Sequence, residues 1–301
     1  MDRIIDNSKS TNKLIIKIFA IFWIVDGLLQ LQPRLLSKDF IDKVINPLFI
    51  NNHTVLQLAA SRLSHIFLLQ PLLFGLLIAL IQITIGIMVF SNRYRRIGLV
   101  ISVLWSLFIW LFGQNAGGIF SHQINPLQSS PGPAVFYTLI SIYFLLSQNK
   151  HELITYLVLF FSWSLFWLVQ MFTILINPGL IRMGIMMKLN NNIPSYLLSL
   201  NRSIQNFSLS HINLVILLLL FIPLIAILSV FFNRKFNIYI SPIWISYLIF
   251  IFVYFQNLGS YYTGLMTDIG IMPIIIFIGF QLFDSGKNFN LIVNKLEKKL
   301  F

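Results

Sequence analysis

The sequence contains no cysteine and few charged side chains. Cysteine is absent from all 301 residues, which excludes thiol nucleophiles, disulfides and iron–sulfur clusters held by thiolates. Only 10% of the residues are charged, against about 25% in a typical soluble domain. A phosphate-binding loop, a Gly-x-Gly-x-x-Gly turn and a Gly-x-Ser-x-Gly motif are also absent. The commonest nucleotide-binding and hydrolase signatures are therefore excluded.

Apolar residues dominate what is present. They make up 57% of the chain, and the mean hydropathy is +0.83. Such a chain cannot cover itself with water-compatible surface, so we expect a multi-pass protein of the cell membrane with the lipid bilayer as its solvent. The formal net charge of +12 would suggest nucleic acid in a soluble protein. Here the cations lie between apolar runs, where topology and anionic lipids explain them, and we expect no nucleic-acid partner.

One short motif occurs twice along the chain. Gln114-Asn115-x-Gly recurs as Gln256-Asn257-x-Gly at an offset of 142 residues, and no gap is needed to align the residues around it. Apolar letters repeat by chance in such a sequence, but a polar motif at a fixed offset does so less easily. We therefore predict two copies of one unit of roughly 145 residues.

Each predicted unit carries four apolar runs that are candidates for membrane helices, which need about 20 mostly apolar residues each. The units are residues 1–148 and 149–301, and the runs are 14–32, 66–90, 97–113, 132–147, 153–176, 211–232, 239–257 and 269–283. We expect an all-α fold of about eight transmembrane helices, arranged as two parallel four-helix repeats. The segment 35–50 and, less clearly, 179–189 predict helices that lie in the membrane interface.

The distribution of lysine and arginine predicts the orientation of these spans. With the N-terminus in the cytoplasm, 14 of the 21 basic residues lie in cytoplasmic segments, and neither Gln-Asn loop contains one. Cytoplasmic loops of membrane proteins are enriched in lysine and arginine. Both termini are therefore predicted to be cytoplasmic, and both motifs are predicted to face outward.

Asp26 is the one acid that lies well inside a predicted span. It sits roughly 18 Å from the inner boundary at 1.5 Å per residue, where an ionised carboxylate costs at least ~2.5–3.5 kcal/mol. Asp26 must therefore face the protein interior or a wet cavity, and no second carboxylate is expected to pair with it in the membrane. Gln30 lies one turn further out, and Gln32 and Arg34 follow. Two interpretations stay open: a polar pocket reached from outside, or a buried Asp that locks helix packing.

The two Gln-Asn motifs also leave two interpretations open. Their amides and the neighbouring glycine N–H groups could bind a small anion or a carbonyl, or they could cap a helix. His65 and His122 are expected near the level of Asp26, which suggests a proton relay. Their spacing matches no known ligand signature, so neither a metal nor a haem site is expected. We take Asp26 and His65 as catalytic candidates. The ligand-binding candidates are polar residues near the predicted outer ends of spans: Gln30, Gln32, Arg34, Gln70, Gln114, Asn115, His122, Gln256 and Asn257.

Two stretches of the sequence are similar to a known family. The run from Phe22 to Pro33 and the ending Gly113–Gly118 resemble a duplicated, largely uncharacterised branch of the DoxX/DoxD membrane proteins. DoxD is the small membrane subunit of thiosulfate:quinone oxidoreductase, and other DoxX-like proteins partner oxidative-stress enzymes. The resemblance implies an accessory subunit of a redox complex, near quinone or sulfur-oxyanion chemistry, with other membrane or extracytoplasmic redox subunits as partners. Gln114 stands where that branch often has Glu.

Two other functions stay open from the sequence. A small-solute carrier or channel, with the two copies as its halves, requires a continuous polar path across the membrane. A non-catalytic scaffold requires only that the polar residues stabilise the bundle. The cofactor stays unassigned; a quinone headgroup, whose carbonyls need donors amid aromatic walls, is the one that we consider.

Overall fold

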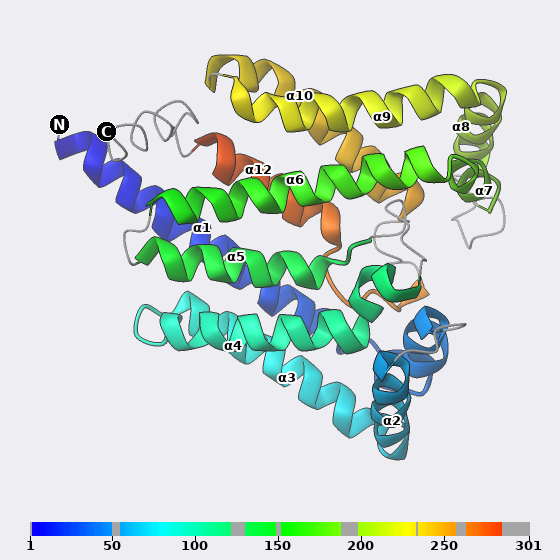
Figure 1. Ribbon diagram of the computed structural model, residues 1–301. Helices are drawn as coiled ribbons and strands as arrows, with labels where there is room; N and C mark the ends of the chain where they lie inside the picture. The colour runs from blue at the N-terminus through cyan, green and yellow to red at the C-terminus, as the bar shows by residue number, and fades with distance from the viewer. Residues whose placement is uncertain are drawn as a thin grey trace. The chain divides into compact units, whose positions relative to one another are not determined.

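The computed structural model describes residues 2–49, 55–121, 130–148, 152–187, 198–232, 234–256 and 263–284 (Figure 1). All regular secondary structure in these ranges is helical, which confirms the all-α prediction for them. Five described helices are long and apolar enough to cross a membrane: Pro71–Phe90, Arg95–Gly113, Leu153–Ile176, Ile212–Phe231 and Phe236–Val253. These helices indicate a membrane protein. The arrangement of eight spans as two repeats stays a prediction.

The chain divides into two compact units that exchange short segments between the halves of the sequence. Unit 1 consists of Met1–Ala116, Pro133–His151 and Gly264–Ile269, and unit 2 consists of Gly117–Gly132, Glu152–Thr263 and Gly270–Phe301. Gly264–Ile269 thus brings residues from the second half of the sequence to the helices of the first half.

Four long helices form the body of unit 1. They are α1 (Asp2–Leu29), α3 (Pro71–Phe90), α4 (Arg95–Phe108) and α5 (Pro133–Gln148). α1 packs along α3, α3 against α4, and α4 against α5 (Figure 1). The Trp23 ring of α1 also contacts the Tyr137 ring of α5, with centroids 4.6 Å apart. Apolar and aromatic side chains therefore fill the space between the four helices.

Two glycines let α1 and α3 approach at backbone distance. A Cβ at Gly27 would lie 2.9 Å from the Ala79 carbonyl oxygen, and one at Gly86 would lie 2.8 Å from the Ala20 carbonyl oxygen. Small residues permit such close helix packing in membranes, where apolar burial alone does not drive association. Because Asp26 neighbours Gly27 on α1, this crossing fixes where the Asp26 carboxyl lies.

The prediction of one continuous span over 66–90 is wrong. The helix α2 (Val55–Leu69) ends before Gln70, and α3 begins at Pro71. Gln70 adopts φ −148° and ψ 73°, because a proline disfavours helical backbone in the residue before it and provides no N–H for the helix. Figure 1 shows α2 running across the end of α3 rather than continuing it.

A short helical segment follows α1, where the sequence predicts an interfacial helix. It contains η1 (Ile41–Ile45) and η2 (Asn46–Phe49), so the helix itself is confirmed. Its buried residues form one cluster with two side chains of α2: Ile41, Ile45, Phe49, Ala60 and Phe67. The apolar side of the segment therefore packs against protein, and its position at a membrane surface stays a prediction.

Unit 2 has its own set of helices. They are α6 (Glu152–Ile176), α7 (Gly179–Met187), α8 (Leu198–Ser210), α9 (Ile212–Leu228), α10 (Arg234–Phe250) and α12 (Ile271–Asp284). α6 packs against α9 and α12, and α10 packs against α9 and α12. The helix predicted over 179–189 corresponds to α7. The break between α8 and α9 at His211 resembles the break at Gln70.

The two Gln-Asn motifs share one local geometry. Each follows a π-helical turn, η3 (Ile109–Gly113) in the first half and η9 (Ile251–Phe255) in the second. The Gln114 N–H donates to the Ile109 carbonyl at 2.9 Å, and the Gln256 N–H donates to the Ile251 carbonyl at 3.0 Å. This common backbone turn supports the predicted duplication, which remains a prediction for the units as a whole.

Tryptophans fill the core of unit 2 around one glycine. The Trp163 ring lies 5.0 Å from the Trp244 ring, centroid to centroid. A Cβ at Gly279 would lie 2.7 Å from Trp163 Cζ3 and 2.8 Å from Trp244 Cη2. We expect Gly279→Ala to lower the free energy of unfolding by about 1–3 kcal/mol, because the added carbon overpacks this core. Thermal melting in detergent measures the effect, and a melting temperature equal to that of the wild type would contradict it.

Candidate functional site

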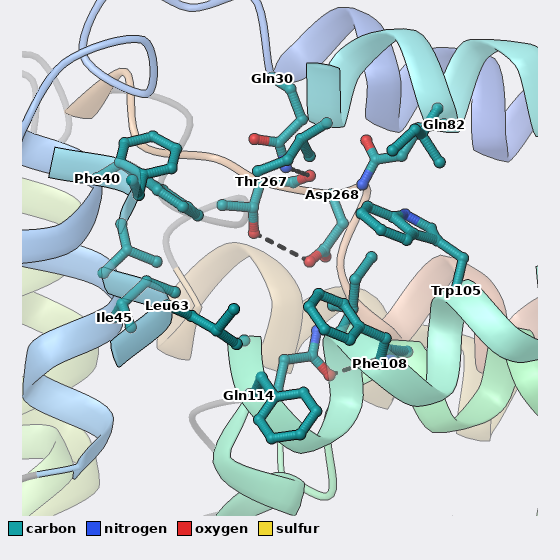
Figure 2. Close-up of a pocket in the computed structure, with 18 of the residues that line it drawn as sticks. Gln30, Phe40, Ile45, Leu63, Gln82, Trp105, Phe108, Gln114, Thr267 and Asp268 are labelled. Atoms are coloured by element: carbon teal, nitrogen blue, oxygen red, sulfur yellow. Dashed lines mark hydrogen bonds between the residues drawn. The ribbon is translucent and has the colours of Figure 1, made fainter. Parts of the chain in front are cut away.

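Unit 1 contains a cavity of about 360 Å³ (Figure 2). Its walls come from α1, the helical segment 41–45, α2, α3, α4 with η3, α5 and residues 267–268. Small-molecule sites usually measure about 300–1,000 Å³ and are mostly apolar with a few placed polar groups. Aromatic side chains form much of the wall, including Trp23, Phe67, Trp105, Phe108, Phe112 and Tyr137. The cavity is therefore large enough for a small ligand with an apolar body.

Asp26 lies in the interior, at the wall of this cavity. Its side chain is 2% exposed, as the cost of a carboxylate in the bilayer requires. The Ile269 N–H donates to Asp26 Oδ1 at 2.9 Å, and the Tyr137 hydroxyl donates to Asp26 Oδ2. The carboxyl thus joins α1 to α5 and to the segment that ends at Ile269.

Two glutamines near the end of α1 hold the same segment. Gln30 Nε2 donates to the Thr267 carbonyl at 3.0 Å, and Gln32 Nε2 donates to the Met266 carbonyl at 2.9 Å. Figure 2 shows Gln30 beside Thr267. Together with Asp26, these side chains fix Gly264–Ile269 by its backbone. The polar residues predicted to contact a ligand therefore contact this segment of the chain, although Gln30 also lines the cavity.

Asp268 is the functional candidate that sequence reasoning missed. The segment held by α1 places Asp268 in the cavity wall, where the Thr267 hydroxyl donates to its carboxylate at 3.1 Å (Figure 2). Asp26 and Asp268 therefore line one cavity, and the expectation that Asp26 has no second acid beside it is wrong. The expectation failed because Asp268 comes from a loop and not from a span. The available signal was an acid in an outer loop without lysine or arginine.

Two other polar side chains of the cavity have unsatisfied atoms. Within the described part of the chain, Gln82 Oε1 and Trp105 Nε1 have no hydrogen-bond partner. Gln82 is only 4% exposed, and both residues line the cavity (Figure 2). A buried polar atom without a partner costs about 1–3 kcal/mol. An acceptor and a donor are therefore available to a ligand.

Gln114 and Asn115 play different parts. Gln114 lines the cavity, and its Oε1 accepts the Ala134 N–H at 3.2 Å. Asn115 Nδ2 donates to the Leu48 carbonyl at 2.6 Å, while Asn115 and Ala116 adopt φ values of 49° and 48°. The left-handed turn thus aims the Asn115 amide at the backbone of η2. This motif ties three elements of unit 1 together, and only its glutamine reaches the cavity.

The remaining candidates lie elsewhere. Arg34 Nε pairs with Asp39 at 3.0 Å, and Lys43 Nζ pairs with the same carboxylate at 2.7 Å. These two cations, Lys43 more than Arg34, lower the pKa of Asp39 below its usual value. His65 is exposed on α2, and Gln70 is exposed at the break before α3. Neither of the last two lines the cavity.

Three further candidates belong to the outer loops or to unit 2. Gln256 is buried in unit 2, and neither its Oε1 nor its Nε2 has a partner among the described residues. His122 and Asn257 lie outside the described residues. In the part of the chain that the structure describes, no three His, Asp or Glu side chains come together in a way that could hold a metal ion.

The chemistry of the cavity is specific to the first half of the sequence. Gln170 stands 144 residues after Asp26, and Gly279 stands 142 residues after Tyr137. The hydrogen-bonded pair that carries the carboxyl in unit 1 therefore has no counterpart at these offsets. Tryptophan rings occupy the space beside Gly279.

Comparisons with known proteins leave the site as the source of functional evidence. No family model matches the chain, and no curated protein or solved structure shows significant similarity to it. What the structure defines is a helical membrane protein with a mostly apolar cavity that carries two carboxyl groups, a free acceptor and a free donor.

Proposed function

We propose that this chain is an integral membrane protein that binds one small amphipathic molecule in the cavity of unit 1. The pairing of Trp105 Nε1 and Gln82 Oε1 carries this proposal, since both are unpartnered among the described residues and both line an aromatic cavity. A ligand with an apolar body and a polar head would satisfy both atoms. It would also fill a space that few protein interiors leave empty.

The proposed topology has eight spans in two parallel repeats, with both termini in the cytoplasm and the cavity toward the outside. The positive charges of the loops support the orientation. The equivalent π-helical turns before Gln114 and Gln256 support the duplication. The cavity would then lie near the outer end of α1, where Gln30 and Asp268 line it.

A role in a redox complex is the second candidate. Quinone carbonyls need hydrogen-bond donors between aromatic walls, and Trp105 Nε1 is such a donor. The resemblance to DoxX/DoxD proteins suggests redox subunits as partners. The sulfur-oxyanion alternative receives no support, because the lining contains two aspartates and no lysine, arginine or histidine among the described residues. Like charges would repel an anion in this apolar setting.

A photoreactive probe tests ligand binding in the cavity. The probe is 3-phenylpropan-1-ol with a diazirine on the ring, added to the full chain in zwitterionic lipid nanodiscs. We expect cross-links on α2, α3 and α4, and a decrease of about tenfold in Ala60→Phe, because a ring at this buried lining position fills the space of the ligand. Ala59→Phe is the matched control, since Ala59 precedes this position and does not line the cavity.

Equal cross-linking in wild type and a folded Ala60→Phe would contradict the proposed site. Competition by decyl-benzoquinone tests the second candidate with the same readout. Displacement of the probe at micromolar concentration supports a quinone ligand. Failure to displace it at saturating concentration argues against the redox role and leaves the binding site intact.

A further inference from the structure

We infer that the ligand of this cavity carries a protonated primary or secondary amine; the inference rests on the proposed binding site and specifies the charge of its ligand. The first observation is the sign of the charges around the cavity. Asp26 and Asp268 line it, and its lining includes no lysine, arginine or histidine among the described residues. A cation is attracted to two carboxyl groups, and the attraction is strong where aromatic walls exclude water.

The aromatic walls are the second observation. Trp23, Trp105 and Tyr137 present rings to the same space as the two carboxyl groups. Aromatic faces attract cations through the ring quadrupole, and tryptophan does so best. A neutral molecule would use these rings only for apolar contact. The combination of rings and acids therefore favours an organic cation over a neutral or anionic ligand.

Gln82 narrows the cation to one with N–H groups. Its side chain is buried, and Oε1 has no partner among the described residues. This oxygen requires a donor. A protonated amine provides N–H groups, whereas a quaternary ammonium or a metal ion provides none. Trp105 Nε1 then needs an acceptor, which a hydroxyl or carbonyl elsewhere on the ligand would supply.

The protein accounts for its other charges near this site without using this cavity. Arg34 and Lys43 pair with Asp39, outside the lining. The carboxyl of Asp26 is held by Tyr137 and Ile269, so it is fixed in place before any ligand enters. Asp268 is fixed by the segment that Gln30 and Gln32 bind. A preorganised pair of acids costs little to reorganise when the cation binds.

The test compares four probes that share one phenylpropyl body with a ring diazirine. Their heads are a primary ammonium, a trimethylammonium, a hydroxyl and a carboxylate. Each is added to the full chain in zwitterionic nanodiscs at pH 7, and the concentration for half-maximal cross-linking is measured. We expect the primary ammonium to bind about tenfold more tightly than the alcohol, since hydrogen bonds to charged groups are the stronger ones. The carboxylate should bind most weakly.

Variants assign the preference to named side chains. Asp268→Asn should remove about tenfold of ammonium affinity and leave the alcohol within about twofold. Gln82→Leu should weaken the primary ammonium and leave the trimethylammonium unchanged, because only the former donates to Oε1. Asp42→Asn is the control: this acid is exposed and does not line the cavity, yet its substitution changes the net charge equally.

The outcomes separate this inference from the proposal beneath it. If the ammonium and the alcohol bind equally in wild type, the amine is ruled out and the binding site stands. A preference for ammonium that survives in both Asp268→Asn and Gln82→Leu also overturns the inference. Absence of cross-linking by all four probes overturns the binding site itself. If Asp268→Asn melts at a lower temperature, Gln82→Leu decides, because it removes no charge.

Discussion

Asp26→Ala should release the segment Gly264–Ile269 from α1 and lower the free energy of unfolding by about 2–6 kcal/mol. The range follows from two donors, the Ile269 N–H and the Tyr137 hydroxyl, that each lose an acceptor at about 1–3 kcal/mol. Thermal melting measures the stability. Thermolysin measures the release, since Leu265 and Met266 become accessible when the segment leaves α1.

Two matched variants test the cause. Asp26→Asn keeps an oxygen for the Ile269 N–H, so we expect a smaller loss of stability and slower cleavage than in Asp26→Ala. Asp42→Ala removes an exposed acid and should change stability by less than about 0.5 kcal/mol. If Asp26→Ala is cleaved no faster than wild type, Asp26 does not hold the segment. Cross-linking by the ammonium probe should also weaken, because Asp268 loses its position.

Gly86→Leu should separate α1 from α3 and cost about 3 kcal/mol or more, beyond the usual range for overpacking. The reason is the partner of the added atom. A Cβ at Gly86 would lie 2.8 Å from the Ala20 carbonyl oxygen and 3.0 Å from the Ile24 backbone nitrogen. Backbone cannot rotate away as a side chain does, so the whole helix must move. Since α1 carries Asp26 and Gln30, ligand binding should be lost together with stability.

Gly113→Ala is the control for this prediction. A Cβ there would meet only one side-chain atom, Ile109 Cγ2 at 3.5 Å, which is ordinary contact. We expect a change within about 0.5 kcal/mol. Melting curves of both variants in the same detergent decide the matter. A Gly86→Leu protein as stable as Gly113→Ala would show that α1 and α3 do not cross at backbone distance.

Several features of the fold follow from local chemistry and were predictable. Long apolar runs must be helices in lipid, because every backbone N–H and C=O has to be satisfied inside the segment. The runs over 97–113 and 153–176 correspond to α4 with η3 and to α6. Asp26 was expected in the interior because its exposure to acyl chains would be costly, and it is buried there.

The predictions failed where a local signal was misjudged or where distant segments meet. Pro71 carried enough information to end a helix, but hydropathy averaged over the run 66–90 concealed the break. His65 lies on the exposed side of α2 because the break changes which face of that run is buried. The partners of Gln30 and Gln32 are backbone carbonyls more than 230 residues away, and nothing near either residue specifies that pairing.

The sequence by itself determined the solvent, the helical class and the need to bury Asp26, because each follows from the transfer cost of single groups between water and lipid. Only the tertiary structure decided that Asp268 lies in the same cavity as Asp26, and that Gln82 and Trp105 have atoms free for a ligand. Those relations depend on which backbone segments come within hydrogen-bonding distance. Such distances arise from the packing of α1 against α3 and of residues 264–269 against α1, and no residue pattern records them.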